Sequence, residues 1–376
     1  MLISSYLLIL LVLSILFFVS NNKIFRALNF FTWLFLVIIS AANTYNNDTT
    51  IYMNIFKSAK NELWIKDVGF GYWMSFANSH NFTYQMVRFL EYLVSFLFIH
   101  FGVKKYIGKY EWILLFLYFL FPFLMDVIEV RNFIFESILI FSLPLLASRK
   151  KTNYLAFFLL YCAACLIHKI GLIYLPAFLL FLISTEKKSV QKVFVTLFIS
   201  AAVIGLFRKQ LSSILMSSSS ALLQIQGISR NLEINNNNGW IVDYVITGAF
   251  FLGSLFNYQV ALLKHKQNQN YLFDVRYRLQ KLIFVLSFYG ALFLPFYAIS
   301  GDYMRIIRNL YLLNYFSIII TFTLPGSNLV FKTKKSNYSI ALVALMIFTS
   351  LASVVYGGNF DSWFGEIFRN NFIFSF

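Results

Sequence analysis

Charged residues and cysteines are scarce in this chain of 376 residues. Only 12% of the residues are charged, which is about half the fraction of a soluble domain. The two cysteines, Cys162 and Cys165, lie within one apolar stretch and therefore indicate neither a disulfide framework nor a redox compartment. The sequence also lacks a Walker loop, a dinucleotide fingerprint, a zinc-ligand spacing and a nucleophile elbow. These absences exclude a soluble enzyme, a disordered chain and a secreted disulfide scaffold.

Apolar residues dominate instead, at 59% of the chain, with a mean hydropathy of +0.71. A helix needs about 20 apolar residues to cross the hydrocarbon core of a bilayer. We therefore predict an all-α integral membrane protein, a polytopic bundle of about 12 transmembrane helices that forms a single domain over residues 1–376. The predicted spans are residues 2–20, 25–42, 83–101, 111–125, 130–147, 153–167, 170–184, 193–207, 241–263, 282–300, 306–324 and 338–356.

The basic residues predict how these spans are oriented. If the N-terminus is outside, the inside loops contain 19 of the 31 Lys and Arg residues and only three of the 15 acidic residues. This distribution follows the positive-inside rule and accounts for the net charge of +16 without a nucleic-acid partner. We therefore expect both termini outside, an uncleaved first span, and large extracytoplasmic loops at about 43–82 and 208–240.

Residues 153–184 are too long for one span, because 32 helical residues would extend about 48 Å. Two shorter helices fit better, with a hairpin tip at His168 and Lys169 that lies at membrane depth. Ionisable groups at that depth need a partner or a water-filled cavity. The tip either satisfies nearby backbone carbonyls or faces a polar cavity.

Polar residues also gather at the predicted outer end of the span 130–147. Glu129, Asn132 and Glu136 are spaced to share one helix face, and Arg131 lies beside them. They either orient the helix within the bundle or form the wall of a polar cavity.

A second polar group begins the span 306–324. Asp302, Arg305 and Arg308 are each three residues apart. One interpretation is an Asp302–Arg305 ion pair with arginines that reach the lipid headgroups. The other is an anion clamp, because two guanidiniums on one face suit bidentate contact with phosphate.

The first outer loop offers two further candidates. Asp48 precedes an amphipathic stretch that includes Tyr52, so it is either the N-cap of a short interfacial helix or part of the same cavity. The aromatic residues at 64–73, among them Trp73, are either an interfacial belt or a platform on which sugars stack.

Taken in order, these segments resemble the EpsG-like branch of the Wzy-type polysaccharide polymerases. The similar segments are NNDTTIYMNIF (46–56), DVGF (67–70), EVRNFIFESILI (129–140), CLIHKIGLIYLP (165–176) and GDYMRIIRNLYLLNYF (301–316). The resemblance runs from about residue 40 to residue 320. One departure is Lys169, which follows the hairpin histidine where the family has a small polar residue.

The resemblance implies a multispan glycosyltransferase of the bacterial cytoplasmic (inner) membrane that polymerises O-antigen, capsule or exopolysaccharide repeat units. The glycan would pass from its undecaprenyl diphosphate carrier to the non-reducing end of another lipid-linked repeat unit on the outer face. The resemblance implies no cofactor and no metal. The expected partners are undecaprenyl diphosphate-linked oligosaccharides and membrane lipid, together with a flippase and a chain-length regulator.

The chemistry of this reaction assigns roles to the candidate residues. The departing diphosphate needs preorganised cations, for which the candidates are Arg305, Arg308, Arg131 and Lys169. The acceptor hydroxyl needs a base, and the candidates for this role are Glu129, Asp48 and His168. The candidates for other contacts with substrate are Tyr52, Asn132, Asp302 and Trp73.

Two other classes of protein remain open at this stage. Twelve spans also suit a lipid-linked oligosaccharide flippase or transporter, although the chain shows no internal repeat. An O-antigen ligase or another outer-face transferase would use the same donor.

Overall fold

The computed structural model describes residues 22–58, 67–148, 150–182, 199, 203, 239–265, 271–297, 304–324, 334–356 and 365–373. Within these ranges the chain is helical and forms no β-strand, which confirms the all-α prediction. The predicted span 2–20, nearly all of the span 193–207 and of the loop 208–240, and Asp302 lie outside the described residues.

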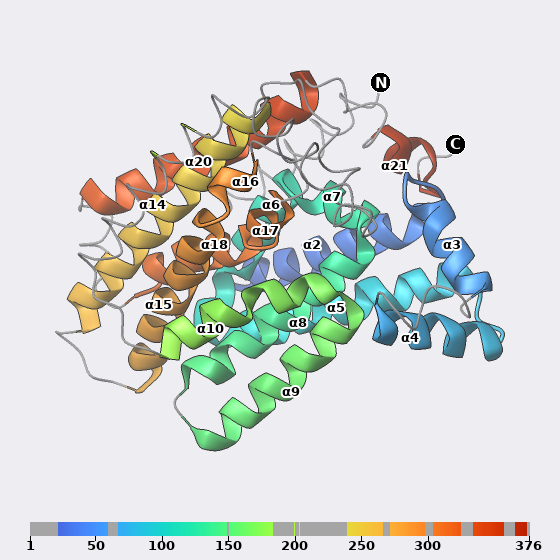
Figure 1. The fold of residues 1–376 in the computed structure, drawn as a ribbon, viewed down its shortest axis with the longest axis horizontal. Helices are drawn as coiled ribbons and strands as arrows, with labels where there is room; N and C mark the ends of the chain where they lie inside the picture. Colours follow the sequence, from blue (N-terminus) through green and yellow to red (C-terminus); the bar gives the residue numbers. More distant parts are fainter. Residues whose placement is uncertain are drawn as a thin grey trace, which may run out of the picture.

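The helices form a bundle in which the long ones lie side by side (Figure 1). Their bounds are α2 (Asn22–Ala42), α3 (Thr49–Lys57), α4 (Val68–Ser79), α5 (Tyr84–Ile107), η1 (Gly108–Tyr110), α6 (Glu111–Leu120), α7 (Phe123–Ile128), α8 (Val130–Ala147), α9 (Lys151–Ile167), η2 (Lys169–Tyr174), α10 (Leu175–Leu182), α14 (Gly239–His265), α15 (Tyr271–Ala291), α16 (Leu294–Tyr297), α17 (Arg305–Arg308), α18 (Tyr311–Phe322), α20 (Lys334–Tyr356) and α21 (Gly365–Arg369).

Two groups of helices make up the bundle. Helix α8 packs between α5 and α9, while α14 packs against α15 and α20. Helix α18 contacts α14, α15, α5 and α6 and so joins the two groups. The short helices α3, α4 and α21 gather at one end, on the right of Figure 1.

Three helical stretches are long and apolar enough to cross a membrane: Tyr84–Leu120, Val130–Ala147 and Ile241–His265. The first combines α5, η1 and α6 and is broken at Gly108, whose φ of 54° is a conformation open mainly to glycine. Four shorter apolar helices are also described, at Asn29–Ala42, Lys151–Ile167, Lys169–Leu182 and Ile340–Ala352. The total of twelve spans stays a prediction.

Several predicted spans differ from the helices observed. The predicted span 306–324 is interrupted at Asn309 and Leu310, which separate α17 from α18. The amide of Leu310 bonds the Ile307 carbonyl at 2.8 Å, an i to i−3 contact that tightens the chain there. Helix α15 begins at Tyr271, well before the predicted start at residue 282. The prediction followed the apolar residues alone, whereas the helix also includes the charged residues Asp274, Arg276 and Arg278.

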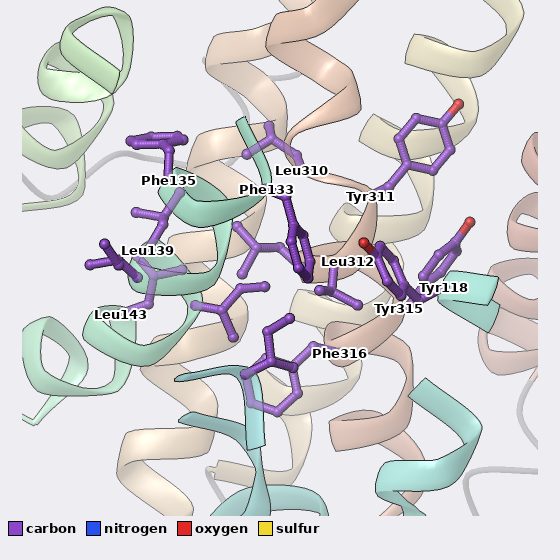
Figure 2. Close-up of a cluster of buried hydrophobic side chains, with 14 of the residues drawn as sticks. Tyr118, Phe133, Phe135, Leu139, Leu143, Leu310, Tyr311, Leu312, Tyr315 and Phe316 are labelled. Atoms are coloured by element: carbon purple, nitrogen blue, oxygen red, sulfur yellow. The ribbon is translucent and has the colours of Figure 1, made fainter. Parts of the chain in front are cut away.

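Aromatic side chains fill the core between α8 and α18 (Figure 2). The Phe133 ring packs against Phe96 of α5, with centroids 5.0 Å apart, and stacks on Tyr118 of α6 at 5.8 Å. The Tyr315 hydroxyl of α18 donates to the Phe121 carbonyl at 2.9 Å. These contacts fix α8, whose first residues contribute to the candidate site, against the helices on either side.

Segments predicted to lie outside meet at one end of the bundle. The Thr44 amide donates to the Asn370 carbonyl at 2.7 Å, and the Phe372 amide donates to the Ala42 carbonyl at 3.1 Å. The end of α2 is therefore joined to the segment after α21.

Segments predicted to lie inside meet at the other end. Arg276 of α15 donates to the Tyr106 carbonyl at 2.6 Å and to the Thr323 carbonyl at 3.3 Å. Arg278 donates to the Tyr154 hydroxyl at 3.5 Å. Segments that the charge pattern assigns to the same side of the membrane are thus in contact at the same end of the bundle. The compartment that each end faces stays a prediction.

Candidate functional site

One carboxylate joins three segments that are distant in sequence. Asp67, the residue before α4, accepts a hydrogen bond from Arg131 Nη1 at 2.6 Å on its Oδ2 atom. Its Oδ1 atom accepts from the Lys169 amide at 2.9 Å and lies 3.4 Å from His168 Nδ1. Asp67 therefore connects the first outer loop, the start of α8 and the tip of the α9–α10 hairpin.

Burial raises the pKa of the Asp67 carboxyl, but its partners more than offset this effect. Hydrogen bonds from His168 and from the Lys169 amide, followed by the charge of Arg131, hold the pKa of Asp67 below its usual value. The carboxylate is therefore ionised at neutral pH.

The glycine two residues later explains why α4 can lie so close to the hairpin. A Cβ atom on Gly69 would lie 2.9 Å from Leu166 Cβ and 3.1 Å from the Leu166 carbonyl carbon and oxygen. In the Asp-x-Gly sequence, the carboxylate of Asp67 thus contacts the hairpin tip. Gly69, which has no side chain, leaves room for Leu166 just before that tip.

Arg131 is held on three sides. Besides its ion pair with Asp67, its guanidinium lies over the Tyr52 ring at 5.3 Å and the Phe70 ring at 5.7 Å. The two rings also pack against each other, with centroids 5.8 Å apart. Tyr52 is buried, so the structure shows it supporting the arginine.

A second ionic group lies beside the first. Glu129, at the start of α8, pairs with Arg308 through its Oε2 atom and lies 3.7 Å from Arg305 Nη2 through its Oε1 atom. The two arginines differ in exposure, since the Arg305 side chain is 45% exposed and that of Arg308 is 9% exposed. The spacing of the two arginines placed them on one helix face, and in the structure both lie beside the carboxylate of Glu129.

Amide side chains position α17 behind this group. Asn132 of α8 donates from Nδ2 to the Asn309 Oδ1 atom at 2.6 Å, and both residues are buried. The Tyr174 hydroxyl of η2 donates to the Ile306 carbonyl at 2.7 Å. Helix α17 is therefore anchored to α8 and to the hairpin.

Asp48 occupies the N-cap position of α3, but its side chain does not cap the helix. Asn46 Oδ1 accepts the Asp48 amide at 3.1 Å instead. The interpretation of the Asp48 side chain as a cap is thus wrong, and its carboxylate lies within electrostatic reach of the acid and the arginines of the cluster.

The surroundings of Asp48 have opposing effects on its acidity. Burial, and then the charge of Glu129, raise the pKa of Asp48 above its usual value. The guanidiniums of Arg305, Arg131 and Arg308 lower this pKa only in part. Asp48 therefore takes up a proton more readily than an ordinary aspartate does.

The hairpin tip was predicted either to satisfy nearby backbone carbonyls or to face a polar cavity, and in the structure it contacts a carboxylate. The His168 ring contacts the Asp67 carboxylate, and the backbone amide of Lys169, rather than its ammonium, contacts the same carboxylate. The Lys169 side chain is exposed. Its assignment to the diphosphate stays a prediction.

Trp73 lies apart from these ion pairs. Its indole Nε1 donates to Glu91 Oε1 of α5 at 3.0 Å, and its ring stacks on Phe76 with centroids 6.3 Å apart. Its hydrogen bond and ring contact are thus with Glu91 and Phe76, whereas Asp67 and Glu129 bond other residues. Its role in binding sugar stays a prediction.

Buried residues support the cluster from below. Arg88 of α5 donates to the Ser40 carbonyl at 3.3 Å and to Asn43 Oδ1 at 3.4 Å, and so holds the end of α2. Deeper in the bundle, Tyr118 donates to Asp126 Oδ2 at 2.9 Å. Glu136, expected on the cavity wall, is fully buried beneath the cluster.

The structure therefore assembles most of the sequence-based candidates and adds others. It brings together Asp48, Tyr52, Glu129, Arg131, Asn132, His168, Lys169, Arg305 and Arg308. Sequence analysis does not select Asp67 as a site residue, although the DVGF motif contains it, nor does it select Asp126, whereas Asn309 lies four residues beyond Arg305 on the predicted polar face. Asp67 could have been found from the pairing of an acid with a glycine two residues later.

The cluster suits anion chemistry better than metal chemistry. Within the described ranges, no three His, Cys, Asp or Glu residues are grouped so that they could hold a metal ion. Three guanidiniums lie together at the end of an apolar helical bundle, each held by a carboxylate. The fold and the cluster define a helical membrane protein with a charged site at the end of its bundle.

Residues 26–364 match the EpsG family, and the chain belongs to that family. Members of the EpsG family are Wzy-like polymerases, so the resemblance seen in the motifs is confirmed. Neither the comparison with curated proteins nor the comparison with solved structures gave a match.

Proposed function

We propose that this protein polymerises a bacterial polysaccharide on the outer face of the cytoplasmic membrane. It transfers a glycan from its undecaprenyl diphosphate carrier to the non-reducing end of another lipid-linked repeat unit. Membership of the EpsG family supports a polymerase. The paired guanidiniums of Arg305 and Arg308 support the diphosphate donor, because the leaving group gains negative charge as the sugar–oxygen bond breaks.

The observation that carries this proposal is the arrangement of the three arginines. Arg131, Arg305 and Arg308 are oriented by carboxylates before substrate arrives, so little reorganisation accompanies the reaction. Arg305, the most exposed of the three, is the one we assign to the diphosphate. Arg308 is buried and orients Glu129, which in turn positions Arg305.

The assignment of the base follows from the same contacts. Glu129 lies against two guanidiniums, which favour its ionised form and make it a weak proton acceptor. We therefore assign Glu129 to holding the arginines. Asp48 and His168 remain as candidates for the base.

Deletion of the gene tests the proposal. The deletion strain should lose long polymer while it continues to make single lipid-linked repeat units, and the wild-type gene should restore the polymer ladder. An unchanged ladder in the deletion strain would refute the polymerase. Repeat units trapped on the cytoplasmic side would indicate a flippase, and long polymer that is not attached to its final acceptor would indicate a ligase.

Arg305→Ala tests the assignment of the anion site. We expect loss of the ladder with normal membrane expression, since this side chain is exposed and its contact with Glu129 is 3.7 Å long. Arg276→Ala, at the opposite end of the bundle, is the matched control for the loss of an arginine. A full ladder in Arg305→Ala would remove this residue from the mechanism.

A further inference from the structure

We propose that Asp67 is a positioning residue that orients the His168 ring so that its Nε2 atom accepts the proton of the acceptor hydroxyl. This inference rests on the proposed function, since it assigns the base of that same reaction. It adds Asp67 to the site and separates the acceptor side of the reaction from the leaving-group side.

The two oxygens of the Asp67 carboxylate have different partners. Oδ1 contacts His168 Nδ1 at 3.4 Å and accepts the Lys169 amide at 2.9 Å. Oδ2 accepts from Arg131 at 2.6 Å. One rigid carboxylate therefore fixes an imidazole and a guanidinium relative to each other.

The backbone of the tip is fixed by the same group. His168 has extended φ and ψ angles of −147° and 111°, and its own side chain does not cap η2. Asp67 takes that role by accepting the first amide of η2, which belongs to Lys169. The position of the imidazole thus depends on Asp67 through the main chain as well as through the ring.

The contact of Nδ1 with Asp67 determines what the other edge of the ring can do. An imidazole that donates from Nδ1 to a carboxylate carries its free electron pair on Nε2. The His168 side chain keeps 18% of its surface exposed, so this edge can be reached. Catalytic hydrogen bonds are often long in the absence of substrate, as the 3.4 Å contact is.

The charged groups that face His168 favour the imidazolium formed during the reaction. Asp67 contacts the ring from α4, and Glu129 at the start of α8 lies within electrostatic reach. Arg131 reaches the far oxygen of Asp67, and the Lys169 ammonium is exposed on the neighbouring residue. Two carboxylates therefore balance the charge that the ring gains.

The step balances as a displacement at the anomeric carbon. The acceptor oxygen forms a bond to that carbon while the bond from the carbon to the diphosphate oxygen breaks. The electron pair of the broken bond leaves with the diphosphate, near Arg305. The hydroxyl proton passes to His168 Nε2 and then returns to water or to the released diphosphate.

Asp48 is less suited to this step because of its neighbours. Its carboxylate lies within electrostatic reach of Arg305, Arg131 and Arg308, where the diphosphate is expected. A base for the acceptor hydroxyl must lie on the other side of the anomeric carbon. The His168 ring contacts the Asp67 carboxylate, and we assign it to that side.

The test uses full-length variants in detergent or proteoliposomes, with the lipid-linked repeat unit extracted from the deletion strain as substrate. His168→Gln should lower kcat by about 100-fold, and Asp67→Asn by about 10- to 100-fold, with little change in KM. The double variant should be no slower than His168→Gln alone.

Matched controls separate this role from a loss of folding. His80→Gln changes the exposed histidine that directly follows α4, and Asp274→Asn changes an aspartate at the other end of the bundle. Both should retain wild-type kcat. A wild-type kcat in a well-folded Asp67→Asn, or multiplied losses in the double variant, would overturn the proposal.

If Asp67→Asn does not reach the membrane, the comparison of His168→Gln with Asp48→Asn tests the proposal. The proposal expects kcat to fall about 100-fold in His168→Gln and far less in Asp48→Asn, and the opposite result overturns it. Failure of the polymerase assignment gives a different result, because the wild-type protein would then extend no repeat unit at all.

Discussion

Removing one partner of the Glu129–Arg308 pair should destabilise the protein. The two side chains are only 14% and 9% exposed, so Glu129→Gln leaves a buried guanidinium without its carboxylate. Such losses cost about 3–5 kcal/mol. Gln keeps an amide oxygen that can accept from the Arg308 guanidinium, which places the expected loss near the lower value, about 3 kcal/mol.

Thermal unfolding of a fluorescent fusion in detergent measures this loss. With a shift of about 2 °C per kcal/mol for a large chain, Tm should fall by about 6 °C. The double variant Glu129→Gln/Arg308→Gln should regain at least half of that fall, because it removes the unpaired charge. It should nevertheless remain unable to make polymer, because it lacks the guanidinium.

The two measurements separate the contribution of the Glu129–Arg308 pair to stability from the contribution of Arg308 to the reaction. A Tm unchanged in Glu129→Gln would show that the ion pair contributes nothing to stability, contrary to the reasoning from burial. Recovery of the polymer ladder in the double variant would show that Arg308 is dispensable for the reaction. Asp274→Asn, with its partner His265 at 3.8 Å near the other end, is the control for a loosely paired acid.

Three further variants test the surroundings of the cluster. Gly69→Ala should cost about 1–3 kcal/mol and lower both Tm and the yield of polymer, because its Cβ would approach Leu166 to 2.9 Å. The pKa of Asp67 is depressed, so its stabilising effect is present above the unfolded-state value of about 3.9 and is lost as the pH falls through the folded-state value. Between about pH 5 and about pH 3, Tm should therefore fall more in the wild type than in Asp67→Asn; equal slopes would contradict this. Trp73→Phe should lower Tm by leaving Glu91 without its 3.0 Å hydrogen bond, and the polymer ladder reports whether an aromatic ring alone suffices at this position.

Long apolar runs predicted the helices well. The predicted span 130–147 matches α8, which the structure places at Val130–Ala147, and the predicted break at His168 separates α9 from η2. Both follow from local physics, since a helix that crosses a membrane needs an apolar run of about 20 residues and a run of 32 residues is too long for one crossing.

Helix interruptions inside apolar runs were not predictable in the same way. Asn309 breaks the run between α17 and α18, where it accepts a hydrogen bond from Asn132 of α8. Nothing in the neighbouring residues indicates that bond, because its donor is 177 positions away. Tertiary contacts therefore decide where such a helix ends.

The partners of the site residues also depend on the fold. The spacing of Arg305 and Arg308 predicted that they act together, yet their shared carboxylate is Glu129, and Arg308 and Glu129 are 179 positions apart. Asp67 and the Lys169 amide are 102 positions apart. Sequence analysis could thus select the charged residues, whereas only the packing of α4, α8 and α17 shows which acid holds which cation.

The charges of the assembled cluster are balanced, which bears on how an anion could bind there. The carboxylates of Asp48, Asp67 and Glu129 face the guanidiniums of Arg131, Arg305 and Arg308. A diphosphate that enters must therefore contact a cation that can be reached from the surface. Arg305 meets this condition, because its side chain is 45% exposed. The raised pKa of Asp48 acts in the same direction, because a proton on that carboxyl removes a negative charge from the path of the incoming anion. Under the proposed function, a proton on Asp48 therefore favours binding of the donor, while Arg308 and Arg131 keep the orientation that the reaction requires.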